Sequence, residues 1–97
     1  MSIILSQKIR DKIADDKHRV TERDIRECFA NTTRGFVEDD REEHRTDPAT
    51  MWFVSENNYG RRIKVMFVIR EGDIYIKSAY PATDVVSAMY ARKSEEL

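Results

Sequence analysis

The chain of 97 residues contains one cysteine, three glycines and two prolines, and it has no long apolar run. A single cysteine, Cys28, excludes a disulfide within the chain. No stretch approaches the ~20 apolar residues that a membrane-spanning helix needs. Residues 1–6 are too short for the apolar core of a signal peptide, and Lys8 and Arg10 follow them directly. We therefore expect a cytoplasmic protein without a membrane partner.

The chain also lacks an excess of charge of either sign. It carries 17 Lys and Arg against 18 Asp and Glu, so its net charge is −1 although 36% of its residues are charged. This excludes a polycation that holds nucleic acid by charge alone, and an RNA-binding role requires a local basic patch. A hydrophobic share of 40% predicts a folded chain, and the length predicts one domain, residues 1–97, with one modest core.

The first half of the chain has the periodicity of helices. A helix over about residues 4–14 is predicted by apolar residues spaced by four, Leu5, Ile9 and Ile13. Thr21 is a helix N-cap signal because an acidic residue, Asp24, follows at the third helical position. It predicts a second helix over about residues 22–30.

The second half has the alternation of strands. We expect an edge strand that begins at Phe36, then strands over about 50–55, 61–70 and 74–80, with a tight hairpin turn at Glu71-Gly72-Asp73. In the last strand, Ile74, Ile76 and Ser78 alternate with Tyr75, Lys77 and Ala79. A short final helix is predicted to be capped by Asp84 and to bury Val85, Val86, Met89 and Tyr90. The order predicts an α+β fold with two N-terminal helices, a four-stranded, mainly antiparallel meander and a C-terminal helix.

The charges form two clusters of opposite sign. Residues 38–47 contain six acids and two arginines. This segment is interpreted either as a solvated loop or as a surface for a basic protein partner, whose contacts would be Asp39, Asp40, Glu42 and Glu43. The paired strands carry basic residues, among them Arg62, Lys64 and Lys77. Beside a tyrosine they could bind RNA phosphate, or they could only protect the sheet from edge aggregation.

Motifs for other chemistries are absent. The three glycines are scattered, so no loop cradles a phosphate, and no spacing of Cys and His suits zinc. We therefore expect neither a metal nor a cofactor. His18 and His44 are the side chains suited to proton transfer near neutral pH, and His44 is preferred of the two.

Several short motifs resemble the BrnT-like toxins, a family in the RelE/ParE superfamily of toxin–antitoxin proteins. The resemblance covers about residues 10–90, through Lys17-His18-Arg19-Val20-Thr21, Cys28-Phe29-Ala30-Asn31, Asp40 with His44, Tyr59-Gly60-Arg61, Arg70-Glu71-Gly72-Asp73, Ser78-Ala79 and Tyr90. Tyr80 stands where the family has an arginine.

This resemblance implies a RelE-like fold, RNA or ribosome-linked RNA as substrate, and a small antitoxin as partner. In RNA cleavage without metal, a base takes the 2′-hydroxyl proton, cations stabilise the phosphorane and an acid protonates the leaving oxygen. Arg61 and Arg70 match basic positions of the family and would contact phosphate, and Tyr80 or His44 would act as acid or base.

Two other functions stay open. The first is a non-catalytic binding module, like an antitoxin or an immunity protein, that uses the acidic segment 38–47. The second is a small domain that forms a homodimer through a sheet edge.

Overall fold

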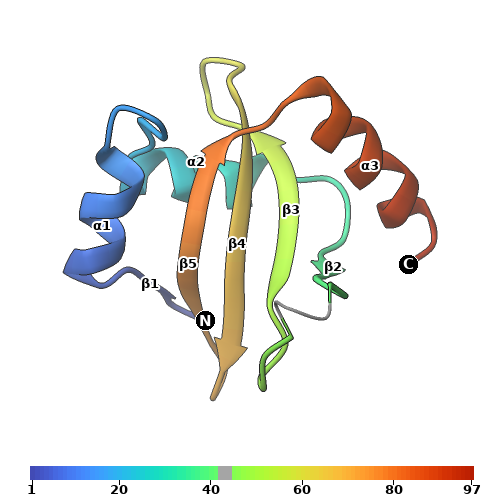
Figure 1. Cartoon of the computed structure of the whole chain (residues 1–97), viewed down its shortest axis with the longest axis horizontal. Coiled ribbons are helices and arrows are strands. Elements are labelled where there is room, and N and C mark those ends of the chain that lie inside the picture. The colour runs from blue at the N-terminus through green and yellow to red at the C-terminus, as the bar shows by residue number, and fades with distance from the viewer. Residues whose placement is uncertain (42–44) are drawn as a thin grey trace.

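A computed structural model describes residues 1–41 and 45–97 of the chain. The elements in chain order are β1 (Ile3–Ile4), α1 (Gln7–Ala14), α2 (Glu22–Asn31), β2 (Val37–Glu38), β3 (Met51–Glu56), β4 (Arg62–Arg70), β5 (Asp73–Pro81) and α3 (Asp84–Glu95). The strands form one sheet in the order β1-β5-β4-β3-β2 (Figure 1). Neighbouring strands are antiparallel except β1, which runs parallel to β5. The predicted α+β class is therefore correct.

The predicted meander of four strands is wrong in one respect, because the sheet has a fifth, parallel strand. Ile3 and Ile4, which were expected to border or begin the first helix, instead pair with Ile74 and Tyr75 of β5. Helix α1 begins only after Ser6, whose hydroxyl accepts a hydrogen bond from the backbone N–H of Ile9 at 3.2 Å. The cap therefore separates the strand from the helix.

Helices α2 and α3 pack against opposite faces of the sheet. Adjacent residues of a strand point to opposite faces, and Phe53 and Trp52 of β3 show this directly. The ring of Phe53 contacts that of Phe29 in α2, with 4.7 Å between centroids, whereas the ring of Trp52 contacts that of Tyr90 in α3 at 5.8 Å. In Figure 1, α2 crosses the sheet while α1 and α3 flank it on either side.

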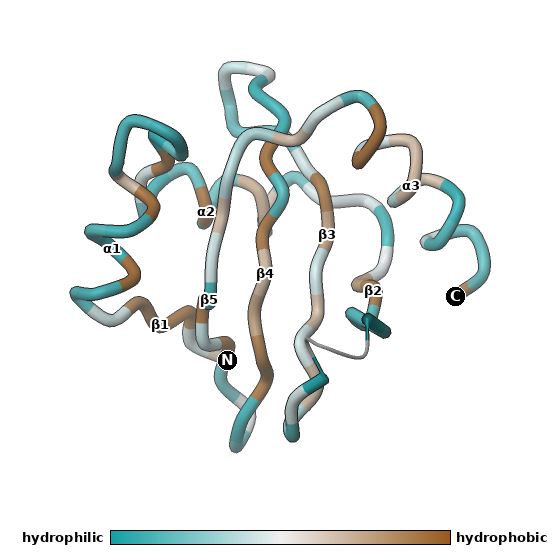
Figure 2. Tube along the Cα trace, viewed as in Figure 1, coloured by the Kyte–Doolittle hydropathy of each residue, from teal (hydrophilic) through white to brown (hydrophobic). Residues whose placement is uncertain are grey.

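The main core lies between α2 and the sheet. Phe29 and Phe36 are half-buried, and both pack against the fully buried rings of Phe53 and Phe67. Figure 2 shows hydrophobic residues concentrated along β4, the central strand, whereas the connection after α1 is hydrophilic. Trp52 is also buried, as its apolar strand predicts, but on the α3 side. Val85, predicted to face inward, is 74% exposed because it lies on the outer side of α3.

A one-residue bulge in β5 changes which side chains share a face. Met66 pairs with Ser78, but the next residue of β4, Phe67, pairs with Ile76, so Lys77 is an extra residue in β5. Beyond an extra residue the alternation of side chains is reversed. Ala79 is therefore buried on the core side, whereas Ser78, which is also buried, points to the opposite face, contrary to the simple alternation expected from the sequence.

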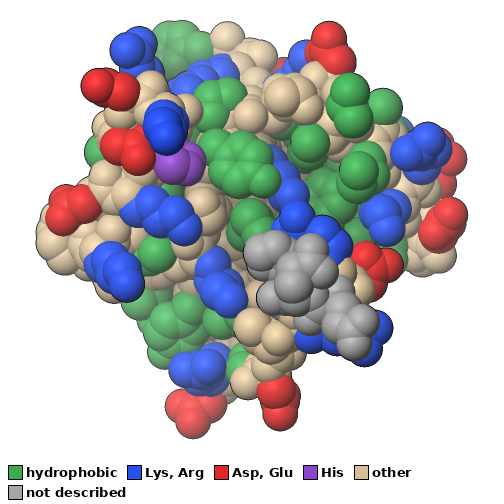
Figure 3. Space-filling view, viewed as in Figure 1, with side chains coloured by type: hydrophobic (Ala, Val, Ile, Leu, Met, Phe, Trp, Pro, Cys, Tyr) green, Lys and Arg blue, Asp and Glu red, His purple; other side chains and the backbone are tan. Residues whose placement is uncertain are grey.

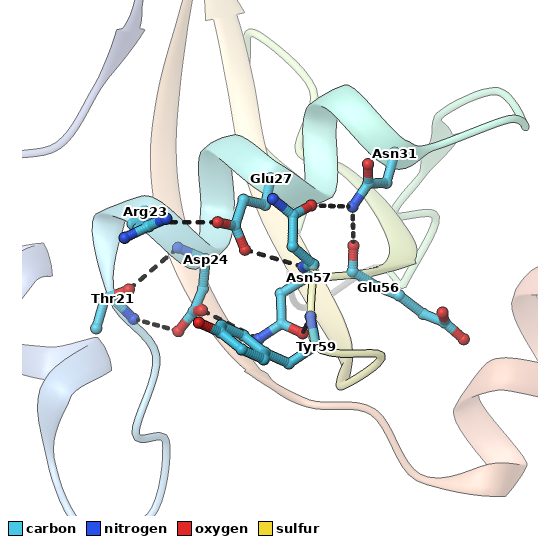
Figure 4. Close-up of polar contacts among 9 residues, drawn as sticks. Thr21, Arg23, Asp24, Glu27, Asn31, Glu56, Asn57 and Tyr59 are labelled. Atoms are coloured by element: carbon cyan, nitrogen blue, oxygen red, sulfur yellow. Dashed lines mark hydrogen bonds and ion pairs between the residues drawn. The ribbon is translucent and has the colours of Figure 1, made fainter.

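The β3–β4 turn is hydrogen-bonded to polar side chains of α2 (Figure 4). The amide of Asn57 donates to the Asp24 carboxylate at 3.1 Å, and the backbone N–H of Asn58 donates to Glu27 at 2.9 Å. Thr21 and Asp24 form the capping box at the start of α2. Burial raises the pKa of Asp24, but hydrogen bonds from Thr21 and Asn57 outweigh it and hold that pKa below its ordinary value. This stabilisation is present above that ordinary value and is lost as the pH falls through the lowered pKa.

Replacing the cap residue tests this anchor. We expect Thr21→Ala to lower the free energy of unfolding by about 1 kcal/mol, because the N–H of Asp24 loses its acceptor. Urea unfolding monitored by circular dichroism measures it. The matched control is Thr33→Ala at an exposed position, and an equal loss in both variants would contradict a role for the cap.

Cys28 lies in the core beneath β3. It is fully buried, and its thiol lies 3.7 Å from the carbonyl oxygen of Ser55. Burial, with smaller effects of the charges on Asp24 and Glu27, raises the pKa of this thiol to about 12. Such a thiol is almost wholly protonated near neutral pH and is a poor nucleophile.

The buried thiol gives a second prediction. At pH 8 we expect Cys28 in the folded chain to react with iodoacetamide far more slowly than in urea-unfolded chain, because the thiolate is scarce and shielded. Mass spectrometry of timed samples measures the two rates. Similar rates would show that the α2–β3 core opens freely.

Candidate functional site

The candidate site is the face of β3, β4 and β5 opposite α2, which we call the open face. It lies between α1 and α3, and Figure 3 shows Lys and Arg side chains on it among hydrophobic groups. Two cavities occupy it. The α1 cavity, of about 480 Å³, is lined by Lys12, Arg45, Thr50, Lys77, Ser78 and Tyr80, among others. The α3 cavity, of about 220 Å³, is lined by Trp52, Lys64, Tyr80, Val86, Met89 and Lys93, among others.

Lys64 is the most unusual residue of this face. Its side chain comes from the third residue of β4, and the residue is only 8% exposed. Its Nζ lies 4.6 Å from the ring centroid of Trp52 and 5.6 Å from that of Tyr80. Among residues 1–41 and 45–97, no carboxylate forms an ion pair with it. A buried ammonium without a counter-charge is costly, and the two rings compensate only part of that cost.

The bulge decides that Tyr80 belongs to this site. In β5, Tyr80 pairs with Lys64 of β4. Without the extra residue Lys77, the alternation expected from the sequence would place Tyr80 with Ile74 and Ile76 on the core side. The bulge turns its ring to the open face, where it lines both cavities.

Further cations line the α1 cavity. The Nζ of Lys77 donates to the hydroxyl of Thr50 at 3.3 Å, which holds the Lys77 side chain across the sheet. Lys12 reaches in from α1, and its Nζ lies 3.5 Å from the carbonyl oxygen of Lys77. The predicted RNA-binding residues Lys64 and Lys77 therefore both lie on the open face, and Lys12 joins them.

A histidine–carboxylate pair lies at the edge of the site. Nδ1 of His18 is 2.6 Å from the Asp15 carboxylate, and this hydrogen bond is the main cause that lowers the pKa of Asp15. The His18 ring meets the ring of Tyr80 edge-on, with 6.1 Å between centroids. The preferred histidine, His44, lies outside the described residues, as do Glu42 and Glu43.

Three predicted basic residues lie elsewhere. Arg61 is turned away from the open face, since its guanidinium donates to the carbonyl oxygens of His18, at 2.8 Å, and of Arg19. Arg62 is ion-paired with Asp84 and lines a separate cavity, of about 370 Å³, on the other side of α3.

Arg70 lies at the far end of β4. It is exposed next to the β4–β5 turn, where it lies opposite Asp73 in the strand pairing. Arg70 is six residues from Lys64 along β4. At the rise of a strand this places their Cα atoms about 20 Å apart. The structure therefore does not bring the predicted catalytic residues Arg61 and Arg70 together with Tyr80.

Two of the acids expected to bind a protein partner, Asp39 and Asp40, contact cations of the chain itself. Asp39 is 6% exposed and pairs with Arg41 at 2.9 Å, so it is no free surface contact. Asp40 is exposed, and its carboxylate lies 3.7 Å from the Nζ of Lys93 in α3. Both residues line the α3 cavity. Part of the acidic segment therefore folds onto the basic face.

Several residues of this site are not predicted by the sequence. Lys12 and Lys93 are on helices distant in sequence, and nothing in their own neighbourhood predicts that they meet the sheet. Trp52 lies in an apolar strand, which predicts a core residue and gives no sign that it also lines a cavity. The spacing Asp15-x-x-His18 was the one available signal for the histidine pair, because residues three apart can meet in a turn.

Comparisons of this chain with protein-family models, curated proteins and solved structures find no match. Within residues 1–41 and 45–97 there is also no group of three or more His, Cys, Asp or Glu side chains that could hold a metal ion. No helix in that part of the chain is long and apolar enough to cross a bilayer.

The position of Arg61 gives a third prediction. We expect Arg61→Ala to lower the free energy of unfolding by about 2 kcal/mol, because two carbonyl oxygens lose charged donors. One of these carbonyls belongs to Arg19, whose φ of 51° is in the left-handed region and needs support from its surroundings. Chemical denaturation measures the change. Arg70→Ala, a control at the far end of β4, is expected to stay within about 0.5 kcal/mol of the native chain.

Proposed function

We propose that this chain binds RNA on its open face and cleaves it without a metal, as a cytoplasmic protein similar to the BrnT-like toxins of the RelE/ParE superfamily. The observation that carries the proposal is Lys64, a nine-tenths buried cation that faces two aromatic rings and has no carboxylate partner among the described residues. An anion supplied by a ligand would compensate this buried charge. An RNA phosphate supplies that anion, and the neighbouring rings suit bases.

The other open-face residues support an extended ligand. Lys12 and Lys77 line a cavity next to that of Lys64, and Tyr80 borders both. A single-stranded nucleic acid places successive phosphates and bases along such a groove. A sheet between flanking helices supports the proposal of a RelE-like architecture. The four strands expected from the sequence are joined by a fifth, β1.

The chemistry assigned to the site uses residues close to Tyr80. His18 takes the proton of the 2′-hydroxyl at its Nε2, since Nδ1 faces Asp15. The 2′-oxygen then attacks phosphorus, and Lys64 and Lys77 stabilise the charge of the phosphorane. As the bond from phosphorus to the 5′-oxygen breaks, the hydroxyl of Tyr80 supplies the proton of the leaving group. Arg61 and Arg70 have no role in this scheme.

The proposed partner is a small antitoxin that covers the open face. An acidic or amphipathic segment would compensate the same cations that RNA contacts, so that RNA and antitoxin exclude one another. The alternative, a binding module that uses acids 38–47, receives less support, because Asp39 is buried and pairs with Arg41.

A substitution of Lys64 tests the proposal. We expect Lys64→Met to weaken the binding of a single-stranded RNA of mixed sequence about tenfold and to reduce the slope of log K against log salt by about one. Fluorescence anisotropy at several salt concentrations measures both. The variant should fold at least as stably as the native chain, because it removes a buried charge and keeps the apolar stem.

The control is Arg70→Gln at the far end of the sheet, for which RNA affinity is expected to stay unchanged. The chemistry is tested by cleavage of the same RNA. We expect the native chain to cleave it in the presence of EDTA, and we expect Tyr80→Phe and His18→Ala to lose cleavage. Native affinity and salt dependence in Lys64→Met would contradict the assignment of the open face.

A further inference from the structure

The α3 cavity has the dimensions and walls of a site for one planar group. Its volume of about 220 Å³ is below the range of about 300–1,000 Å³ typical of pockets for larger ligands. Trp52 from β3 and two residues of α3, Val86 and Met89, form an apolar wall. An aromatic ring system gains dispersion and stacking contacts on such a wall. A single RNA base fits this description.

The cavity also has a charged residue that calls for a ligand. Lys64 is 92% buried, its ammonium lies between the rings of Trp52 and Tyr80, and it is part of the cavity lining. No carboxylate among the described residues forms an ion pair with it, so an anion next to the bound base would offset its charge. A nucleotide provides both groups at once, a base for the wall and a phosphate for the ammonium.

The rim of the cavity carries a carboxylate beside an ammonium. The Asp40 carboxylate, 73% exposed, lies 3.7 Å from the Nζ of Lys93, 36% exposed. At this distance the pair is loose, and both groups keep hydrogen-bonding capacity for a ligand. A carboxylate can accept two parallel hydrogen bonds, and an ammonium donates to an oxygen. The pair therefore complements a base edge that presents two adjacent N–H donors next to an oxygen acceptor.

Guanine is the base with that edge. Its N1–H and N2–H are neighbouring donors, and O6 lies beside them, whereas adenine, cytosine and uracil offer a carboxylate only one donor position on this edge. We propose that the α3 cavity binds a guanine of the RNA, with Asp40 accepting from N1–H and N2–H, Lys93 donating to O6 and Lys64 contacting the attached phosphate. This inference rests on the proposed RNA-binding function and adds a base preference to it.

The single tryptophan of the chain reports directly on this cavity. Titration of the full chain with guanosine 5′-monophosphate should change the fluorescence of Trp52, after correction for absorption by the nucleotide. A bidentate contact between a side chain and a base is worth enough to give about tenfold discrimination. We therefore expect adenosine 5′-monophosphate to bind about tenfold more weakly, and inosine 5′-monophosphate, which lacks the N2 amino group, to lie between them.

The decisive variant is Asp40→Asn. An amide keeps the size of the carboxylate but presents one acceptor and one donor, so the ratio of guanosine to adenosine affinity should fall to near one. Both absolute affinities can rise, since a negative charge near the phosphate is removed, and the ratio is therefore the quantity to compare. Glu71→Gln, an exposed change of the same kind at the β4–β5 turn, should leave the ratio as it is in the native chain.

Three results would overturn the guanine site: equal affinities for the two nucleotides in the native chain, a preference that survives in Asp40→Asn, or binding that leaves Trp52 fluorescence unchanged. The binding of RNA of mixed sequence distinguishes failure of the guanine site from failure of the proposed RNA-binding function. If Lys64→Met still weakens RNA binding while no guanine preference exists, only the base assignment is wrong. If neither nucleotides nor RNA bind, both proposals are wrong.

Discussion

The pairing of β4 with β5, with one extra residue in β5, is the constraint on which the rest of this molecule depends. β4 is the centre of the sheet, and its residues alternate between a core covered by α2 and an open face between α1 and α3. The extra residue Lys77 reverses the alternation in β5. It places Ala79 in the core and Tyr80 opposite Lys64. One extra residue therefore determines both which side chain fills the core and which ring lies beside Lys64.

The second consequence of this pairing is a buried cation that forms no ion pair with a carboxylate of residues 1–41 and 45–97. Lys64 lies within the central strand, and its ammonium is held beside Trp52 and Tyr80 rather than in solvent. The other cations of the open face come from α1, the segment before β3, β5 and α3. The near-zero net charge is therefore no obstacle to an anion-binding surface, because charge is segregated in space rather than along the sequence.

Much of the fold was predictable from local patterns. The spacing of Leu5, Ile9 and Ile13, the capping box of Thr21 and Asp24, and the turn at Gly72 all act within a few residues of their own positions. β1 was not predictable because two residues carry too little pattern, and its partner lies about 70 positions away. Val85 was misassigned for a related reason, since a short helix with apolar residues on several sides does not reveal which side packs.

By itself the sequence determined the α+β class, the order of the three helices and of the longer strands, and the presence of both acidic and basic clusters, because these depend on neighbouring residues. Only the tertiary structure decided which charged residues act together. It gave the side chains of Arg61 and Arg62 different partners and placed Arg70 at the far end of the sheet. It also turned Asp39 and Asp40 toward the basic face, and it joined Lys12, Lys64, Lys77 and Lys93 around Tyr80. The physical reason is that strand register and one bulged residue fix the direction of each side chain, and neither is encoded in local periodicity.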